Sequence, residues 1–188
     1  PYTSFQRIQL EDLLALKDYL FSVPPVRQKN LPHDLILPFA EQAALMFWKN
    51  FAWSPRPFKP NQERTESWNR GAYIAKALAH CGECHTPRNL LGALKSEMHY
   101  AGSKEGPEGE LAPNITPDKK TGIGNWSKVD VSYFLRTGMK PDGDDSQGLM
   151  GEVIDLGYQY LLEEDLDALA EYLVSLPPIS NQLRQEKS

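Results

Sequence analysis

The residues best suited to chemistry lie together in one pentapeptide, Cys81-Gly82-Glu83-Cys84-His85. This is the C-x-x-C-H spacing that attaches a c-type haem. A single helical turn places the two thiols where both haem vinyl groups can be reached, and the adjacent imidazole then points at the iron from the same side. The pattern therefore predicts one covalent haem c, bound through Cys81 and Cys84, with His85 as an iron ligand.

Two other uses of a C-x-x-C pair compete with haem attachment. A zinc site needs a fourth ligand, usually from a second C-x-x-C or an H-x-x-H, and the sequence contains neither. A thioredoxin-like redox pair expects a βαβ context, which is not apparent here, and gives His85 no role. With only two cysteines in the chain, a disulfide framework is also excluded.

The other axial ligand of the iron must come from elsewhere in the chain. Met150 follows Gly148 in a segment flexible enough to fold over the haem face, while Met139 lies eleven residues earlier and is its rival. Methionine also fills gaps in cores, so the residues alone favour Met150 only slightly. Met46 and Met98 are interpreted as packing or surface residues, and His80 is too close to the motif to reach the far face of the haem. His33 and His99 are expected at the surface, although His99 is kept as a possible ligand because it lies in the long loop.

Three helices are expected to position these residues. Apolar side chains at helical spacing predict a helix over 67–80 that runs straight into Cys81, and further helices are expected near 128–137 and over 163–176. Residues 92–127 are rich in glycine and proline and show no periodicity. A loop of that length is suspicious unless it is functional, and wrapping a large flat ligand would give it a surface to pack on. No segment alternates like a strand, so the fold is expected to be mostly α.

One stretch of sequence occurs twice. Residues 11–25 read EDLLALKDYLFSVPP and residues 164–178 read EDLDALAEYLVSLPP, with 10 identities in 15 positions. In each copy an acidic pair opens a helix, leucines recur at helical spacing, and a Pro-Pro pair ends it. We interpret the match as a duplication. Between the copies, residues 24–66 are rich in proline and are expected to form a connector with one helix near 39–52, which packs on its neighbours through Phe39, Ala43, Phe47 and Phe51.

Composition sets outer limits on function. At 188 residues the chain corresponds to one domain and a remainder, and 40% apolar with 24% charged residues is ordinary for a globular protein. A net charge of −5 argues against nucleic acid as a partner. No apolar run in these residues is long enough to span a bilayer, and we expect none of them to form a signal peptide. Because the chain starts at Pro1, we expect it to be processed or to be a piece of a longer protein.

Four segments together carry a family resemblance: AHCGECHTPRN, LAPNITPD, TGIGNWS and a late Gly-Leu-Met. They are similar to the cytochrome c subunits of membrane-bound bacterial dehydrogenases for alcohol, gluconate, glucose or fructose. The resemblance implies an all-α cytochrome c fold, with one complete haem domain over 67–179. It also implies that residues 1–26 are the closing helix of a preceding haem domain, residues 27–66 the connector and residues 180–188 a tail.

The resemblance also assigns roles to single residues. It implies that His85 is the proximal ligand, that its other ring nitrogen bonds the carbonyl of Pro113 or a neighbour, and that Met150 is the sixth ligand. Haem propionates need hydrogen-bond donors, and Arg88, Asn114 and Trp126 are the candidates. The alternatives are a surface salt bridge for Arg88 and core packing for Trp126.

These assignments predict an electron carrier rather than an enzyme, in the periplasm, where thioether haem attachment takes place. Its expected partners are a dehydrogenase catalytic subunit and a downstream quinone or oxidase, with membrane attachment through parts absent from this chain. The alternative function is a haem enzyme with a displaceable distal methionine. The C-x-x-C-H of the preceding domain is missing, so we expect a fragment; the alternative is that residues 1–26 are a relic that buttresses a single-haem protein.

Overall fold

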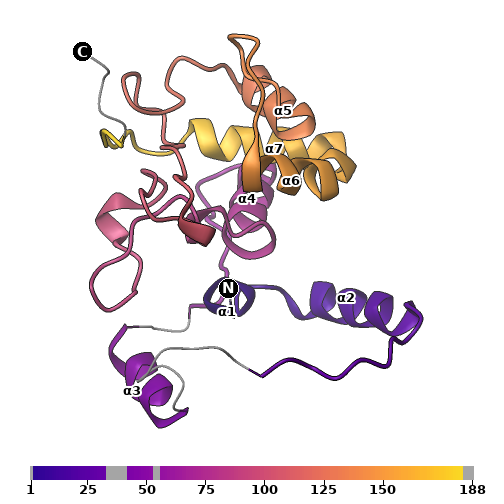
Figure 1. Cartoon of the computed structure of the whole chain (residues 1–188). Coiled ribbons are helices and arrows are strands. Elements are labelled where there is room, and N and C mark those ends of the chain that lie inside the picture. The colour runs from indigo at the N-terminus through magenta and orange to yellow at the C-terminus, as the bar shows by residue number, and fades with distance from the viewer. Residues whose placement is uncertain (1, 33–41, 53–55, 184–188) are drawn as a thin grey trace.

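The computed structural model describes residues 2–32, 42–52 and 56–183, and this part of the chain is helical (Figure 1). Its α-helices are joined by 3-10 turns, one π-helical turn and long irregular segments. Within these residues no strand forms, and β-pairing is limited to three isolated bridges, such as the one between Ser103 and Ala112. The expectation of an all-α fold is confirmed.

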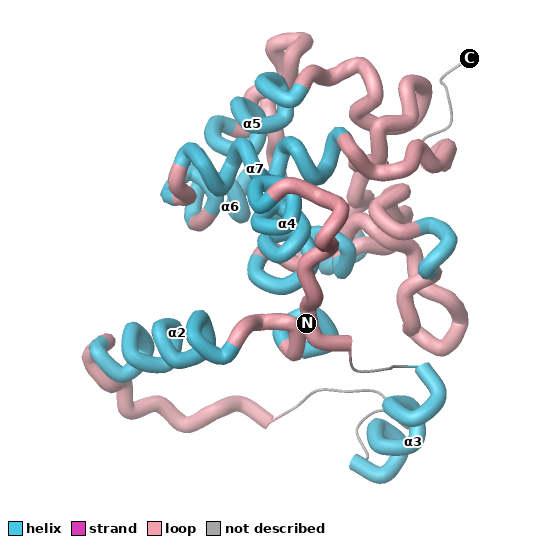
Figure 2. Tube along the Cα trace, turned by 180° about the vertical axis from the view of Figure 1, so that it is seen from behind, coloured by secondary structure: helices cyan, strands magenta, loops and turns pink. Residues whose placement is uncertain are grey.

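The core lies where α4 (Glu66–Tyr73) crosses α7 (Glu163–Val174), with α5 (Lys128–Thr137) packed on α7. The leucines at helical spacing in α7 are buried in this core: Leu166, Leu169 and Leu173. Helix α6 (Gly148–Leu156) and the turn at Tyr158–Tyr160 pack beside α5. Helices α4, α5, α6 and α7 thus lie together and form the main body of the described part of the chain (Figure 2).

Polar contacts fix how these helices begin. Thr65 caps α4 by accepting a hydrogen bond from the backbone N–H of Trp68, and Ser127 forms a capping box with Asp130 at α5. Arg70 of α4 donates two hydrogen bonds to Asp165 of α7, at 2.6 and 2.8 Å. This forked ion pair sets the register between the two crossing helices.

Gly71 is the point of closest approach between α4 and α7. A Cβ at this position would collide with the backbone carbonyl of Ala168, which no side-chain rotation can move away. The absence of a side chain at Gly71 is therefore what lets the two helices cross so tightly.

Gly71→Ala is expected to destabilise the protein by about 2–3 kcal/mol, because the added methyl group overpacks the crossing. Helix propensity alone predicts the opposite sign, a gain of about 1 kcal/mol. Denaturant unfolding of the two proteins separates these outcomes. An equally stable or more stable alanine variant would show that the crossing is looser than the structure indicates.

The helix expected over 67–80 is shorter and less regular than the sequence suggests. It begins at Glu66, widens into a π-helical turn over Ile74–Leu78 and does not reach Cys81. The Ala79 N–H bonds the Ile74 carbonyl at 2.8 Å, five residues back, and His80 then adopts a left-handed conformation with φ 41°. The π turn and the reversal at His80 rotate the following cysteines out of the helical register.

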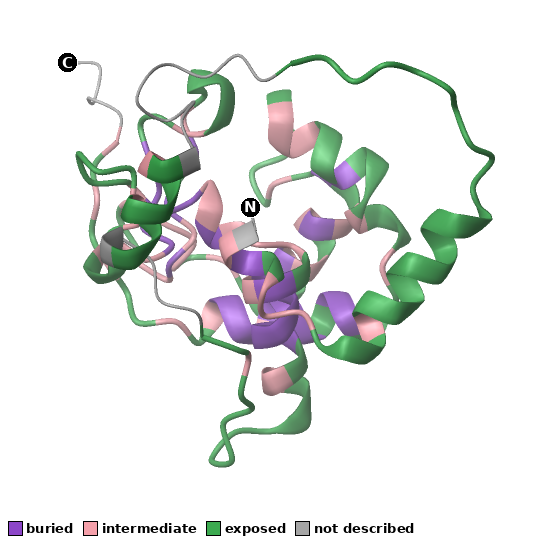
Figure 3. Ribbon diagram, turned by 90° about the horizontal axis from the view of Figure 1, so that it is seen from below, coloured by how far each residue is buried: buried purple, intermediate pink, exposed green. Residues whose placement is uncertain are grey.

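The two copies of the repeated sequence form helices in different surroundings. Helix α2 (Leu10–Ser22) buries none of its residues, whereas its counterpart α7 is the most deeply buried helix of the core. Leu16 is 47% exposed, while Leu169, its equivalent in α7, is 0% exposed. In Figure 3 the ribbon of α2 is almost entirely in the exposed colour, and in Figures 1 and 2 it stands apart from α4–α7.

The connector is only partly described. Helix α3 (Gln42–Ala52) lies within the predicted 39–52, but Phe39 and the side chain of Phe51 fall outside the described residues. Ala43 and Phe47 are largely exposed, and the expectation that this stretch packs on its neighbours stays a prediction. The link that the structure does show is a hydrogen bond from the Trp48 indole to the Leu91 carbonyl.

Long irregular structure over 92–127 is confirmed, with only short 3-10 turns at Ser96–Met98 and Pro107–Gly109. The helices near 128–137 and 163–176 are also confirmed, as α5 and α7. Two elements were not predicted, the short α1 (Tyr2–Phe5) and α6. In the described part of the chain, no helix is both long and apolar enough to cross a membrane.

Candidate haem site

The attachment turn is a 3-10 turn over Cys81–Glu83 that follows the reversed backbone at His80. The His85 N–H bonds the Cys81 carbonyl at 3.0 Å, which closes the turn. Both cysteines are partly buried and neither forms a disulfide. The turn therefore presents two free thiols and one imidazole from a single compact loop.

The thiols are in surroundings that keep them protonated. Burial raises the pKa of Cys81 to about 11, although a hydrogen bond with Tyr158 opposes the shift. Burial and the charge of Glu83 also raise the pKa of Cys84. Redox-active C-x-x-C pairs instead have lowered thiol pKa values. This difference argues against the thioredoxin-like alternative.

His85 is 8% exposed and is fixed in one tautomer. Its Nδ1 lies 2.7 Å from the Pro113 carbonyl, the contact that the family resemblance implies, and because a carbonyl only accepts, Nδ1 must donate. Nε2 therefore carries the lone pair, and it has no hydrogen-bond partner among the described residues. Burial lowers the pKa of His85, partly opposed by the Pro113 carbonyl, so the ring is neutral, as an iron ligand must be.

The two candidate methionines differ in their surroundings. Met150, in the first turn of α6, packs against the buried core in the same apolar group as Cys81 and Trp126. Met139 is 46% exposed in a small loop where it pairs with Asp145, and it does not belong to that group. The structure therefore places Met150, rather than Met139, among the residues that pack against the core, as Cys81 also does.

Of the three side chains expected to donate to haem propionates, Trp126 is the one not already engaged in hydrogen bonds to the described residues. It is half-buried, packs edge-on against Phe134 with ring centroids 5.3 Å apart, and its indole N–H makes no hydrogen bond to the described residues. Arg88 instead forms an ion pair with Glu83 at 2.7 Å and donates to the Gly92 carbonyl. Its guanidinium is thus held on the Glu83 side of the turn.

Asn114 also has another use. Its side-chain N–H groups donate to the Thr121 hydroxyl and the Ile179 carbonyl, at 2.9 and 2.8 Å, and its oxygen accepts two hydrogen bonds from Thr116. Both amide hydrogens are therefore occupied. Asn114 ties the long loop to the segment that follows α7, and it has no donor left for a propionate.

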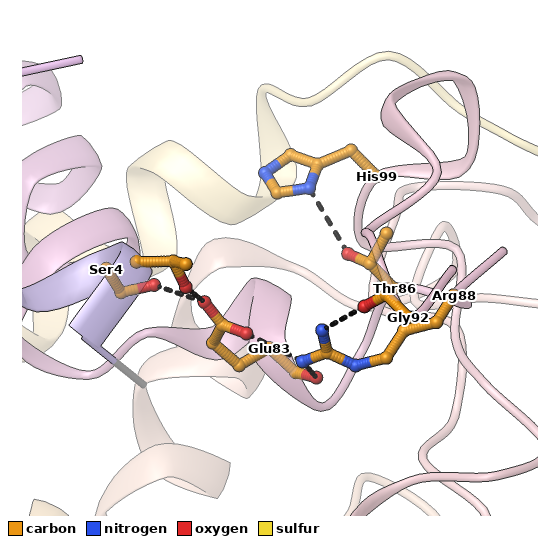
Figure 4. A network of polar contacts seen from close by, with 7 residues as sticks. Ser4, Glu83, Thr86, Arg88, Gly92 and His99 are labelled. Atoms are coloured by element: carbon orange, nitrogen blue, oxygen red, sulfur yellow. Dashed lines mark hydrogen bonds and ion pairs between the residues drawn. The ribbon is translucent and has the colours of Figure 1, made fainter. Parts of the chain in front are cut away.

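His99 is not a surface residue, contrary to expectation. Its ring hydrogen-bonds with the Thr86 hydroxyl at 3.2 Å (Figure 4). The ring also packs over Tyr100 and lies against Gly82, where a Cβ would come within 2.6 Å of it. Burial lowers its pKa to about 4, and the positive charges of Lys76 and Arg7 act in the same direction. His99 thus supports the attachment turn from behind as a neutral ring.

The buried neutral state of His99 predicts a pH dependence of stability. Between pH 6.5 and about 4 the unfolded chain takes up a proton that the folded chain rejects, so stability falls as the pH falls through this window. We expect His99→Gln to reduce that loss by about 2 kcal/mol. Unfolding free energies measured from pH 7 to 4 test this, and an unchanged slope in the variant would contradict it.

The donor set suits a haem c. Two unpaired thiols, a neutral imidazole with a free Nε2 and a thioether beside an apolar cluster are the groups that such a cofactor requires. Zinc would instead draw on a fuller set of ligands, and the described residues contain no group of three or more His, Cys, Asp or Glu side chains that could hold a metal ion.

Comparison with known proteins agrees with the interpretation of these residues as a haem site. The chain is 38% identical over 180 residues to a "Diheme cytochrome c-type" protein of Cereibacter sphaeroides, covering 95% of this chain and 58% of that protein. It is also 38% identical over 179 residues to the fructose dehydrogenase cytochrome subunit of Gluconobacter japonicus, covering 94% and 36%. The chain is a homologue of bacterial dehydrogenase cytochrome c subunits.

The chain is also 34% identical over 184 residues to the gluconate 2-dehydrogenase cytochrome c subunit of Pantoea cypripedii, covering 94% of this chain and 42% of that protein. This chain thus spans between about a third and three fifths of the length of these three relatives. No family model matches the sequence.

Proposed function

We propose that this chain is an electron-transfer c-type cytochrome with one haem attached through Cys81 and Cys84. The observation that carries the proposal is His85, whose Nδ1 is held by the Pro113 carbonyl at 2.7 Å and whose neutral Nε2 is left unused beside two free thiols. The bound haem would supply one-electron chemistry. The role of the protein is then to hold that group rigidly and to keep water from it.

Met150 is proposed as the sixth ligand. Its place in the apolar group that includes Cys81 supports this role, because a thioether in such surroundings favours ferrous iron and raises the reduction potential. If His85 and Met150 both held the iron, no position would remain for a substrate. This is what distinguishes an electron carrier from the haem enzyme considered above.

Trp126 is proposed to donate its indole N–H to a haem propionate. Its half-buried position and unused donor support this assignment. Arg88 and Asn114 stay predictions as propionate donors: Arg88 uses part of its guanidinium to pair with Glu83, and both amide hydrogens of Asn114 bond Thr121 and Ile179.

The proposed partners are a dehydrogenase catalytic subunit as electron donor and a quinone or oxidase as acceptor, with the protein in the periplasm. Relatives named as cytochrome subunits of fructose and gluconate dehydrogenases support the donor. A redox titration followed by absorption tests the function: we expect one reversible one-electron step and no binding of carbon monoxide. Ready binding of carbon monoxide would favour the enzyme alternative, and a colourless protein would contradict haem binding altogether.

Helix α2 is proposed to be the closing helix of a preceding haem domain. Its repeat partner α7 covers α4 with side chains that α2 leaves exposed, so α2 has a face built to cover a helix of the same kind. The haem-to-protein ratio of the natural protein tests this. A ratio above one supports the preceding domain, and a ratio of one contradicts it.

A further inference from the structure

A cavity of about 320 Å³ lies behind the attachment turn, on the side where the N-terminal segment packs. Gly82 and Glu83 of the turn line this cavity, together with Ser4 of the N-terminal segment. Four cationic side chains also line it: Arg7, Arg56, Lys76 and Arg88. This is a concentration of positive charge in a chain whose net charge is −5.

The single carboxylate of this cavity is already engaged. Glu83 accepts hydrogen bonds from Thr3 at 2.5 Å and from Ser4 at 2.8 Å through one oxygen, and it pairs with Arg88 at 2.7 Å through the other (Figure 4). These contacts outweigh burial and lower the pKa of Glu83. Glu83 therefore neutralises Arg88, and both of its oxygens are already engaged.

The remaining cations have no carboxylate partner among the described residues. The Nε of Arg7 is buried without a hydrogen bond, and the Nζ of Lys76 lies 5.4 Å from the centroid of the Tyr172 ring. Burial lowers the pKa of Lys76, and the nearby charge of Arg7 lowers it further. Two unpaired charges in partly buried positions repel each other and lack the hydrogen bonds that would offset their desolvation.

A second, smaller cavity of about 240 Å³ shares three of these residues. Arg7, Arg56 and Lys76 line it too, and Lys59 adds a further positive charge. The three shared cations thus stand at the boundary between two cavities. A group bound there could be reached from both sides by their side chains.

We propose that this cavity binds a small oxyanion, a carboxylate or a phosphate, between Arg7 and Lys76, with Arg56 at its edge. Guanidinium groups match the geometry of both anions, and a lysine supplies a compact charge beside them. The volume lies at the lower end of small-molecule sites, which favours a small anion over a polymer. The bound anion places negative charge against Gly82 and Glu83, on the back of the attachment turn.

Calorimetric titration of the purified protein with inorganic phosphate and with citrate, at constant ionic strength, tests the proposal. We expect saturable binding of one anion per chain for at least one of them, and the one that binds identifies the anion as phosphate or carboxylate. Lys76→Met and Arg7→Gln should each weaken it by about tenfold or more, because each removes one charge-assisted contact. The matched control is Lys104→Met, an exposed lysine that lines neither cavity.

Thermal unfolding with and without the anion separates a lost site from a lost fold. A ligand that binds the folded chain raises its Tm, so at one anion concentration the Tm of the wild type and of Lys104→Met should rise by the same amount and that of Lys76→Met by clearly less. The proposal is overturned if neither anion binds saturably. It is equally overturned if Lys104→Met weakens binding as much as Lys76→Met does, since the attraction would then be general to the surface.

Discussion

Replacing Met150 with alanine is expected to open one axial position of the haem iron. The variant should lose the low-spin ferric spectrum, bind carbon monoxide when reduced, and show a reduction potential lower by on the order of 0.1–0.2 V. The physical reason is that the thioether stabilises ferrous iron, and water or no ligand replaces it in the variant. Absorption spectroscopy and a redox titration measure both effects.

Met139→Ala is the matched control, because Met139 is 46% exposed in a loop and lies outside the apolar group of Met150. It should leave spectrum and potential unchanged. If Met139→Ala opens the iron and Met150→Ala does not, the axial assignment is reversed. If neither does so, the sixth ligand is another residue.

Replacing both Cys81 and Cys84 with alanine is expected to abolish covalent haem attachment. Any haem that still binds should be extracted by acidified organic solvent, and the protein should lose much of its stability, because the long loop over 92–127 would lose the surface on which it packs. Haem staining of a denaturing gel measures attachment, and circular dichroism measures the remaining helix.

The single variants Cys81→Ala and Cys84→Ala are the controls, and each should keep one thioether and a stainable band. Alanine is a mild substitution at both positions, since neither cysteine has a disulfide to lose. A double variant that keeps covalently bound haem would show that attachment does not run through these thiols.

Local signals in the sequence were sufficient for part of the fold. Helix α5 begins at a capping box, and α7 combines an acidic first turn with leucines at helical spacing, so both were predicted nearly to the residue. Helix α6 has two glycines and no side-chain cap, which is why it was expected to be a flexible segment. The π turn after α4 was missed because the apolar spacing of 67–80 continues through it.

The candidate site shows the same difference between features that depend on local sequence and features that depend on distant residues. The attachment turn and His85 are adjacent in sequence, so their spacing was enough to predict them. The surroundings of Arg88, Asn114 and His99 depend on residues far away in the chain or on which face of a loop turns inward. Asn114, for example, donates to the carbonyl of Ile179, 65 residues further on, and no local sequence pattern predicts that contact.

The repeated sequence predicts helix formation but not burial. Ten identities in 15 residues predicted two similar helices, and the structure has them in α2 and α7. Sequence similarity could not predict that one is buried and the other exposed, because burial depends on the partner that each helix meets.

The most direct test of the central claim is the intact mass of the purified protein under denaturing and reducing conditions, followed by mapping of the peptide that carries the added mass. We predict that a haem stays bound to the chain and that its mass maps to the peptide containing Cys81-Gly82-Glu83-Cys84-His85. A peptide of unmodified mass, from protein matured in cells that attach haem c, would contradict the account.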